Sequence, residues 1–321
     1  MPESLYLVDA FSLIFQVFHA LPEMASPAGL PTNAVFGFAK DMVALRRERQ
    51  PTHLVCCFDA PGKTFRDEFF PEYKAQRGPM PEDLQSQIPM IQEMLDAMRI
   101  PVVQLEGYEA DDVIAPLARA GAGRGMDVFI CSGDKDCRQL LSEKIKIFNL
   151  RKNLVFDADA LMADWGIAPD QVIDYQTLVG DSVDNIRGVE GVGPKTAAKY
   201  LQEYGTLENL VQHVDDLKGK KRENLLAFLP RLEETRRLVT LHTAVPIALD
   251  WDGWRVREWN APLLLECFRN WNFRGLADQV RATVKSTAPP PRASQSVQGD
   301  LFAEASPEPD DGRRWPEPYA Y

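Results

Sequence analysis

Long apolar runs are missing from this 321-residue sequence, and no stretch approaches the roughly 20 residues that a membrane-spanning helix needs. The first residues, Met-Pro-Glu-Ser, do not have the composition of a signal peptide. We therefore expect a cytoplasmic protein with no membrane partner. With 45% apolar and 26% charged residues, the chain can build one large domain or two modest ones.

Cysteine is also scarce. The five cysteines, at positions 56, 57, 131, 137 and 267, do not have the spacing of a metal site. Three of them lie in or beside predicted strands, where a thiol behaves as a small buried apolar group. We therefore expect neither disulfides nor cysteine-bound metal.

Positive charge is in deficit, because the net charge is −11, and this at first argues against a nucleic-acid partner. Nine acids that belong to the motifs described below contribute −9 to this total, and residues 286–321 contribute −3, so the rest carries +1. Divalent cations bound among the nine acids would raise the local potential further. The overall charge therefore does not exclude nucleic acid.

Nine acidic residues stand in five groups, four of which follow short apolar runs with the composition of strands. The nine are Asp9, Asp59, Glu109, Asp111, Asp112, Asp134, Asp136, Asp181 and Asp184. In open parallel sheets, functional side chains gather outside the carboxyl ends of the strands, so we expect these acids to meet at one sheet edge. Their repulsion would be strong unless a cation lay between them, and carboxylate oxygens suit Mg²⁺ or Mn²⁺.

For any one of these acids the alternative is a helix cap or a turn former, the usual role of a single Asp after a strand. That alternative stays open above all for Asp111 and Asp136. The group as a whole predicts a metal site, because two ions about 4 Å apart can stabilise both the attacking and the leaving oxygen of a phosphodiester.

The first half of the chain alternates short apolar runs with helical patterns, which predicts a three-layer α/β domain with a mostly parallel sheet. Expected strands lie near 4–8, 54–58, 101–105, 127–131 and 145–148, and expected helices near 33–49, 84–98, 110–120 and 136–142. The expected helix caps are Thr32 or Asn33, Asp83, and Glu109 or Asp111.

From about residue 168 the pattern turns helical. The expected helices are 169–178, 194–203, 206–213, 221–228, 230–241 and 261–271. We therefore divide the chain into an α/β core at 1–165, a helical part at 166–285 and a tail at 286–321. The tail is rich in Pro, Ser and acidic residues, a composition that indicates disorder.

The helical part contains the sequence Gly-Val-Glu-Gly-Val-Gly-Pro-Lys-Thr-Ala-Ala, which begins at Gly188. Its glycines let the backbone approach a ligand, Pro194 suits the first position of a helix, and the free N–H groups there would point at an anion. A tight turn between two helices is the alternative. Because Pro-Lys-Thr follows the glycines, we expect a helix-hairpin-helix that grips a phosphate backbone without reading bases. Its predicted DNA contacts are Gly191, Gly193, Lys195, Thr196 and Lys199.

Residues 62–81 follow the strand that ends near Asp59 and interleave basic with aromatic residues. The candidates for contact with DNA are Lys63, Arg66, Tyr73, Lys74 and Arg77. Such a mixture suits a mobile segment that grips single-stranded nucleic acid by charge and stacking. A solvated loop with extended cationic side chains has the same composition, so the residue types alone leave both interpretations open.

In chain order, these segments read LVDAF, CFDAPGKTFR, PEYKAQRGPMP, YEADDV, CSGDKDCRQL and GDSVDNIRGVEGVGPKTAAKYL. Together they resemble the 5′→3′ exonuclease, or flap endonuclease, domain found at the N-terminus of bacterial DNA polymerase I and in stand-alone bacterial exonucleases. The resemblance covers roughly residues 4–285. It implies a PIN-like core, an arch within about 62–100 and a helical subdomain with a helix-hairpin-helix of the H3TH type.

The resemblance also implies roles for the residues. All nine acids would belong to a site for two Mg²⁺ or Mn²⁺ ions: Asp9, Asp59, Glu109, Asp111 and Asp112 mainly at the metal that activates water, and Asp134, Asp136, Asp181 and Asp184 nearer the second. Lys74 and Arg77 would steer the phosphate, with Tyr73 as a stacking partner. A monovalent cation is implied at the helix-hairpin-helix. The implied protein is a monomeric, nucleoid-associated bacterial nuclease that acts on DNA with a 5′ end, flap or nick in primer removal and repair.

Three positions depart from the family pattern, namely Ala10, Gln16 and Arg187. We expect Ala10 and Arg187 to be tolerated, whereas Gln16 replaces a basic residue and removes one phosphate contact. Two other functions compete. A PIN-type ribonuclease would share the acids but lack the helix-hairpin-helix, and a non-catalytic DNA-binding scaffold would have lost metal ligands.

The tail contains Gln298-Gly-Asp-Leu301-Phe302, which resembles the short peptide by which bacterial replication proteins dock on the sliding clamp. Gly299 replaces the Leu that is common in that peptide. Five residues match by chance easily, so clamp binding through Gln298, Leu301 and Phe302 and an ordinary tail both stay open.

Overall fold

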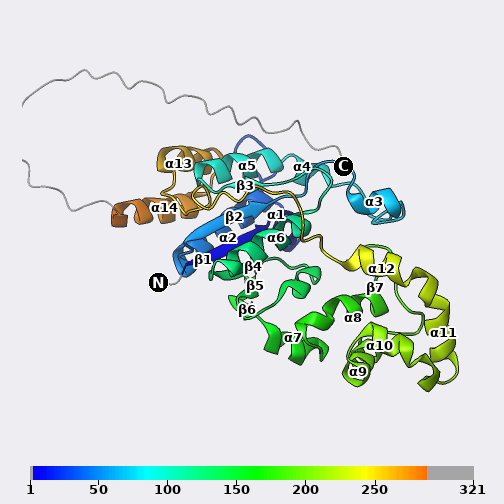
Figure 1. The fold of residues 1–321 in the computed structure, drawn as a ribbon. Coiled ribbons are helices and arrows are strands. Elements are labelled where there is room, and N and C mark those ends of the chain that lie inside the picture. The colour runs from blue at the N-terminus through cyan, green and yellow to red at the C-terminus, as the bar shows by residue number, and fades with distance from the viewer. Residues whose placement is uncertain (1–2, 288–321) are drawn as a thin grey trace, which may run out of the picture.

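The computed structural model describes residues 3–287 (Figure 1). At its centre is a six-stranded sheet with the order β3-β2-β1-β4-β5-β6, in which β1 to β5 are parallel and β6 is antiparallel. The strands are β1 (Ser4–Asp9), β2 (His53–Cys57), β3 (Val102–Val103), β4 (Asp127–Cys131), β5 (Ile145–Asn149) and β6 (Leu154–Phe156). The predicted α/β class and all five predicted strands are confirmed. The short, exposed edge strand β6 was not predicted.

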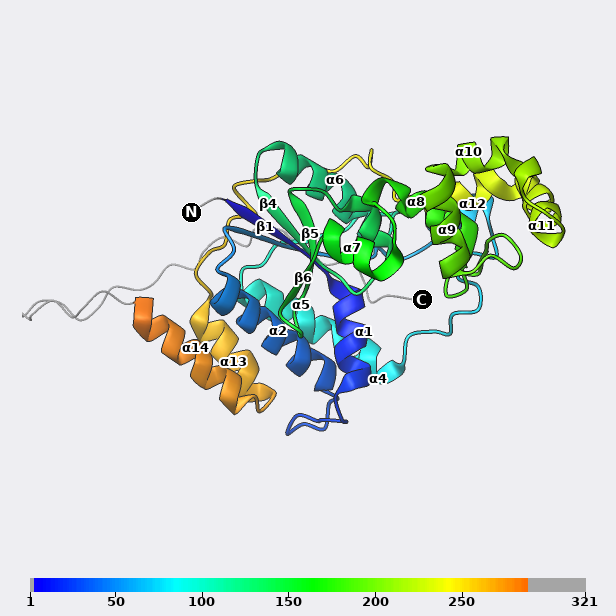
Figure 2. The ribbon, with the colours of Figure 1, turned by 90° about the horizontal axis from the view of Figure 1, so that it is seen from below.

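Helices cover both faces of this sheet (Figures 1 and 2). The helices of this half are α1 (Ala10–Ala20), α2 (Asn33–Arg49), α3 (Phe65–Phe69), α4 (Glu82–Gln85), α5 (Ile88–Ala97), α6 (Ala110–Gly123), the 3₁₀ helix η1 (Asp136–Leu140) and α7 (Ala158–Trp165). Successive side chains of a strand point to opposite faces, so the apolar residues of β1 form a core on each face. Tyr6 and Val8 pack in a core with residues of α1, α2 and α5, whereas Leu5 and Leu7 pack in a second core with residues of α6. In the described residues, no helix is long and apolar enough to cross a membrane.

The predicted helix 84–98 is interrupted, and the structure forms α4 and α5 instead. Between them lies Gln87, whose buried Oε1 accepts hydrogen bonds from the backbone N–H groups of Ala34 and Val35, at 2.8 and 3.1 Å. Gln87 therefore satisfies N–H groups at the start of α2, a role that we had assigned to Thr32 or Asn33. The Thr32 side chain makes no capping bond.

Other boundaries also differ from the prediction. Glu109 is the N-cap of α6 as expected, but α4 begins after Pro81, so that Asp83 lies inside its first turn. The segment expected as a helix at 136–142 is a 3₁₀ helix that ends at Leu140. The short helices α3 and α7 were not predicted.

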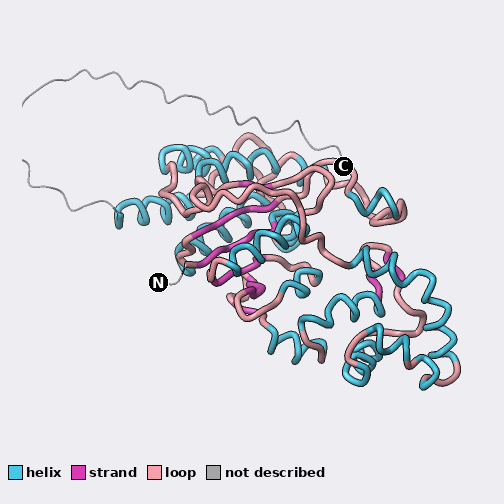
Figure 3. The backbone as a smooth tube through the Cα atoms, viewed as in Figure 1, coloured by secondary structure: helices cyan, strands magenta, loops and turns pink. Residues whose placement is uncertain are grey.

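After residue 166 the described chain is mostly helical, as expected (Figure 3). The elements are η2 (Pro169–Gln171), α8 (Val172–Val179), β7 (Gly180–Asp181), β8 (Ile186–Arg187), α9 (Pro194–Tyr204), α10 (Leu207–Gln212), η3 (Val214–Asp216), α11 (Lys220–Phe228), η4 (Leu229–Arg231), α12 (Leu232–Val239), α13 (Ala261–Asn270) and α14 (Arg274–Thr287). Strands β7 and β8 form a separate antiparallel pair.

The last two helices do not pack with the helical part, to which we had assigned them. Buried side chains of α13 and α14, among them Leu264, Phe268 and Val280, belong to the core that α1, α2 and α5 form on one face of the sheet. Figure 2 shows α13 and α14 beside α2. Of the predicted tail at 286–321, residues 286 and 287 belong to α14, and residues 288–321, with the candidate clamp-binding peptide, lie outside the described residues.

Candidate metal and nucleic-acid site

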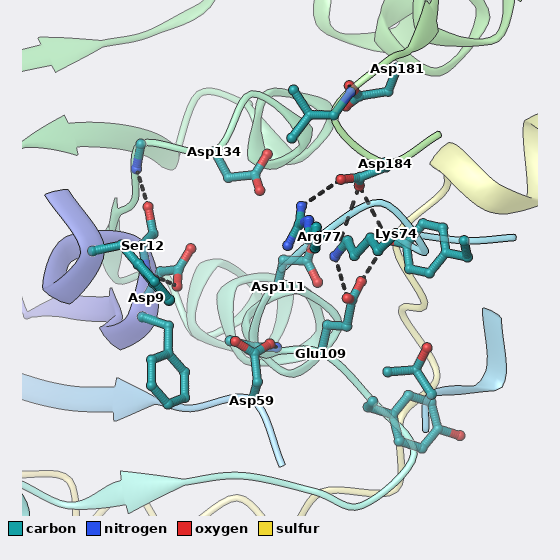
Figure 4. A pocket seen from close by; sticks show the side chains of 18 of the residues that line it. Asp9, Ser12, Asp59, Lys74, Arg77, Glu109, Asp111, Asp134, Asp181 and Asp184 are labelled. Atoms are coloured by element: carbon teal, nitrogen blue, oxygen red, sulfur yellow. Dashed lines mark hydrogen bonds and ion pairs between the residues drawn. The ribbon is translucent and has the colours of Figure 1, made fainter. Parts of the chain in front are cut away.

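One cavity of about 710 Å³ lies at the carboxyl edge of the sheet, and seven of the nine predicted acids line it (Figure 4). The seven are Asp9, Asp59, Glu109, Asp111, Asp134, Asp181 and Asp184. Asp9 ends β1, and Asp59 and Asp134 follow β2 and β4, the two parallel neighbours of β1. Adjacent parallel strands thus bring carboxylates to one edge, as predicted. Asp112 and Asp136 are not among the residues that line the cavity.

Asp9 is held by two serines. Its carboxylate accepts hydrogen bonds from the backbone N–H of Ser12, at 3.2 Å, and from the Ser132 hydroxyl, at 2.6 Å. The Ser12 hydroxyl in turn accepts a bond from the Gly133 N–H at 3.0 Å, which joins the first turn of α1 to the segment that follows β4. Burial, followed by the charge of Asp59, raises the pKa of Asp9 to about 7. The sequence analysis predicted neither serine. Ser12 lies three residues after Asp9, which is the spacing between a helix N-cap and the backbone N–H that its side chain binds, so this spacing is a signal for Ser12.

Glu109 and Asp59 meet at the start of α6. Glu109 is the N-cap of this helix, and its backbone N–H donates to the Asp112 carboxylate at 3.4 Å. The Ala110 N–H donates to Asp59 at 2.8 Å. Free N–H groups and the helix dipole favour carboxylates at this end of a helix. Burial, followed by the charge of Glu109, nevertheless raises the pKa of Asp59.

Asp111 and Asp112 are sequence neighbours in opposite surroundings. Asp111 lines the cavity, and burial together with the charge of Asp112 raises its pKa well above the ordinary value. Asp112 is fully buried, and its two oxygens accept bonds from Arg66, at 2.5 and 2.9 Å, and from the His242 N–H, at 2.8 Å.

Oxygens of Asp111, Asp112 and Glu109 lie within 4.8 Å of one another, close enough to share an ion. Arg66 nevertheless engages both Asp112 oxygens, so Asp112 balances a buried cation instead of facing the cavity. In this arrangement Asp112 therefore pairs with Arg66, whereas Asp111 lines the cavity. The metal-ligand role of Asp112 stays a prediction.

A second acidic cluster contains Asp136, Asp181 and Asp184, with oxygens within 4.8 Å of one another. Asp181 ends β7 and Asp184 follows it, so both reach the cavity from the helical part. Asp136 approaches from η1 and accepts a hydrogen bond from the buried side chain of Gln176. Burial, followed by the charge of Asp134, raises the pKa of Asp136 to about 8.

Two cations of the segment between α3 and α4 point into the same cavity (Figure 4). The Lys74 ammonium contacts Glu109 and lies 3.9 Å from Asp184, and Arg77 contacts Asp184 at 2.6 Å. Burial acts to raise the pKa of Glu109, but Lys74 and Arg66 outweigh it and the pKa is lowered. Lys63, which precedes α3, is exposed.

Arg66 and Tyr73, which we had predicted to contact DNA, are buried, with only 2% and 5% of their surface exposed. Besides Asp112, Arg66 donates to the backbone oxygens of Leu238 and Thr240, at 3.0 and 3.3 Å. The Tyr73 hydroxyl donates to Glu109 at 2.8 Å. Both side chains therefore fasten the segment to the helical part and to the site, which corrects the predicted base stacking and phosphate contact.

The glycine-rich segment forms the predicted turn before a helix. Its predicted contacts Gly191, Gly193, Lys195, Thr196 and Lys199 all lie in this turn or in the first half of α9. Gly191 has a φ of 74°, a conformation that strains other residues, and Gly193 is the N-cap of α9. Lys195 and Lys199 are exposed, and neither takes part in an ion pair within the described chain. None of these residues lines the cavity.

The three departures from the family pattern lie in different environments. Gln16 lines the cavity, where its Nε2 lies 3.4 Å from the Ser12 hydroxyl. Ala10 is fully buried at the start of α1, and Arg187 is exposed on β8. Only Gln16 therefore changes the charge of the cavity wall.

Comparison with known proteins identifies the family. A family model described as 5′-3′ exonuclease, N-terminal resolvase-like domain, matches residues 4–166, and one described as 5′-3′ exonuclease, C-terminal SAM fold, matches residues 167–262. The chain belongs to the 5′-3′ exonuclease family. A 5′-3′ exonuclease of Aquifex aeolicus is 38% identical to this family member over 278 residues, which are 87% of this chain and 95% of that protein.

DNA polymerase I of Rhizobium leguminosarum is 39% identical over 287 residues, and DNA polymerase I of Bacillus subtilis is 37% identical over 283 residues. Each match covers 87% of this exonuclease-family chain. The chain spans only 28% and 32%, respectively, of the lengths of these two polymerases.

Solved structures confirm the fold of this 5′-3′ exonuclease family member. T5 5′-exonuclease with bound zinc has a TM-score of 0.62 at 23% identity, over 88% of this chain and 99% of that one. The catalytic core of Rad2 in complex with DNA substrate has a TM-score of 0.61 at 19% identity, over 88% and 93% of the two chains. A PIN-like core with a helical C-terminal part is therefore the architecture of the chain.

Proposed function

We propose that this chain is a metal-dependent, structure-specific 5′→3′ exonuclease and flap endonuclease that hydrolyses DNA phosphodiesters at 5′ ends and flaps. One observation carries the proposal: seven carboxylates from five chain segments line a single cavity that also receives Lys74 and Arg77. Carboxylates suit divalent metals, and the cations suit the phosphate on which those metals would act.

The donor set fits two Mg²⁺ or Mn²⁺ ions. It consists only of hard oxygen donors in two groups, and burial, followed by the charge of a neighbouring carboxylate, raises the pKa values of Asp9, Asp59 and Asp111. We assign one ion to Asp9, Asp59, Glu109 and Asp111, and the other to Asp134, Asp136, Asp181 and Asp184. When bound, such a pair would supply water activation and charge stabilisation for in-line attack on phosphorus.

The chain's own residues would hold the carboxylates in place and bind the phosphate. Ser12 and Ser132 hold Asp9 as an acceptor at the cavity, and the N-terminus of α6 holds Glu109 and Asp59. Lys74 and Arg77 would bind the scissile phosphate and draw it toward the carboxylates. Their place on a segment outside the sheet lets them close on a 5′ strand.

Duplex DNA would lie on the helix-hairpin-helix. The turn at Gly191 and Gly193 and the start of α9 can accept phosphates, with Lys195 and Lys199 adding charge. A monovalent cation at this turn belongs to the proposal. We propose residues 1–165, with α13 and α14 packed on them, as the catalytic core, and the helices from α8 to α12 as the duplex-binding part, which also supplies Asp181 and Asp184 to the site.

The wider setting is also proposed. A monomer located with the nucleoid in the cytoplasm would remove primers and repair DNA with 5′ ends, flaps or nicks, with docking on the sliding clamp through Gln298, Leu301 and Phe302. The polymerase activity for which the two longer relatives are named would reside in the part of those proteins that this chain does not match.

The test is cleavage of 5′-labelled flap, nicked and single-stranded DNA, with Mg²⁺ and with EDTA. We expect Mg²⁺-dependent release of short 5′ products, and loss of cleavage in Asp111→Asn. An RNA strand of the same sequence serves as the control for a ribonuclease. Cleavage of the RNA but not of the DNA, or activity in EDTA, would refute the proposal.

A further inference from the structure

A glutamine of α8 reaches the second acidic cluster from inside the core. Gln176 is only 3% exposed, and its Nε2 donates a hydrogen bond to Asp136. Its other amide atom, Oε1, is buried and has no hydrogen-bond partner among the described residues. Most buried side-chain polar atoms have a hydrogen-bond partner, so the unpaired oxygen of a side chain that contacts this acidic cluster calls for an explanation.

Asp136 depends on this contact. It does not line the cavity itself, yet one of its oxygens lies within 4.8 Å of oxygens of Asp181 and Asp184. Its backbone N–H is tied to Asp134 at 2.8 Å, which fixes the main chain but leaves the side chain free to turn. Within the described residues, the hydrogen bond from Gln176 is the contact that fixes the direction of the Asp136 carboxyl group.

We propose that Gln176 is a positioning residue for the second metal ion. Its N–H fixes the Asp136 carboxyl group, one oxygen of which lies within 4.8 Å of oxygens of Asp181 and Asp184, and its unpaired amide oxygen is a hard donor of the kind that Mg²⁺ prefers. This inference rests on the proposed two-metal nuclease. It means that a buried residue of the helical part contributes to the affinity for the second metal ion.

The experiment counts Mn²⁺ ions bound to the full chain without DNA, by electron paramagnetic resonance titration. The wild type should bind two ions. Gln176→Leu, which keeps the volume but removes both amide atoms, should weaken only the weaker binding event, by about 10- to 100-fold, the range for residues that orient a metal ligand. In cleavage assays the Mg²⁺ concentration for half-maximal rate should rise to the same extent, and kcat should recover at high Mg²⁺.

Gln139 provides a matched control, because it lies on the same 3₁₀ helix as Asp136 but bonds only backbone groups. Its Nε2 donates to the Val239 oxygen at 3.0 Å and its Oε1 accepts from the Leu241 N–H at 2.9 Å. Gln139→Leu should lower the thermal stability and leave both Mn²⁺ affinities unchanged. A purely structural role of Gln176 would make the two variants behave alike.

Gln176→Asn is the second variant, in case Gln176→Leu does not fold. It keeps a buried amide but is too short to hold Asp136 in the same way, so it should also weaken the second ion. Wild-type Mn²⁺ affinities in a folded Gln176 variant would overturn the inference. Failure of the wild type to bind Mn²⁺ or to cleave DNA would instead refute the proposed function.

Discussion

The neighbouring residues Asp111 and Asp112 should respond to the same substitution in opposite ways. Asp112→Asn replaces one of two oxygens that accept bonds from Arg66 with an amide group that cannot accept them. The guanidinium is 2% exposed and would lose the nearer of its two carboxylate partners, keeping only Glu109 at 3.2 Å. Breaking a buried ion pair by removing one member typically costs about 3–5 kcal/mol of folding free energy. For a chain of this size that corresponds to a fall in Tm of roughly 10 °C.

Asp111→Asn should instead leave the metal-free protein as stable as the wild type, or more stable. An asparagine can keep the bond that Asp111 accepts from the Asp112 N–H at 2.7 Å, and it removes a charge whose pKa is raised by burial. Cleavage should be lost, however, because the cavity loses a carboxylate. Asp112→Asn, assayed well below its Tm, should keep cleavage within about tenfold of the wild type, because it removes no group that lines the cavity.

The assays are thermal unfolding in EDTA and single-turnover cleavage of a 5′ flap in Mg²⁺, on both variants and on the double variant Arg66→Met/Asp112→Leu. The double variant removes both charges and should recover part of the lost stability. Recovery should be incomplete, because Arg66 also bonds Leu238 and Thr240. Loss of cleavage in Asp112→Asn with an unchanged Tm would refute the reasoning and return Asp112 to the metal ligands.

Three further predictions concern DNA, pH and the tail. Lys195→Gln should flatten the slope of log duplex affinity against log salt concentration by about one unit. The control is Lys152→Gln, at another exposed lysine, which should leave the slope unchanged. Equal slopes for Lys195→Gln and the wild type would exclude a phosphate contact at α9. Burial raises the pKa of Asp9 to about 7 and of Asp136 to about 8. Because the folded state then holds protons that the unfolded chain releases near pH 4, their contribution should destabilise the metal-free protein as the pH rises to about 8. Mg²⁺ should therefore raise Tm more at pH 8 than at pH 5, and equal shifts would contradict this. Removal of residues 288–321 should leave cleavage of free oligonucleotides unchanged but abolish its stimulation by the sliding clamp. Clamp stimulation of the truncated chain equal to that of the full chain would disprove this.

The sequence by itself determined the sheet and the place of the site. Apolar runs followed by Asp9, Asp59 and Asp134 indicate parallel strands, and such strands necessarily bring their carboxyl ends to one edge. The turn at Gly191 and Gly193 was equally predictable, because a positive φ and a helix start restrict the residue types locally. These features depend on neighbours in the chain, so local patterns contain them.

Only the tertiary structure decided which member of a motif does what. Asp111 and Asp112 are adjacent on a helix and must face different directions, but the partner that claims Asp112 is Arg66, 46 residues away in the sequence. The same packing buries Tyr73, and it places Gln87 against the start of α2, 53 residues before it. A cation near aromatic residues has the same local pattern whether it meets DNA or a buried carboxylate. The difference is set by which distant segment packs against it, and that is a property of the fold.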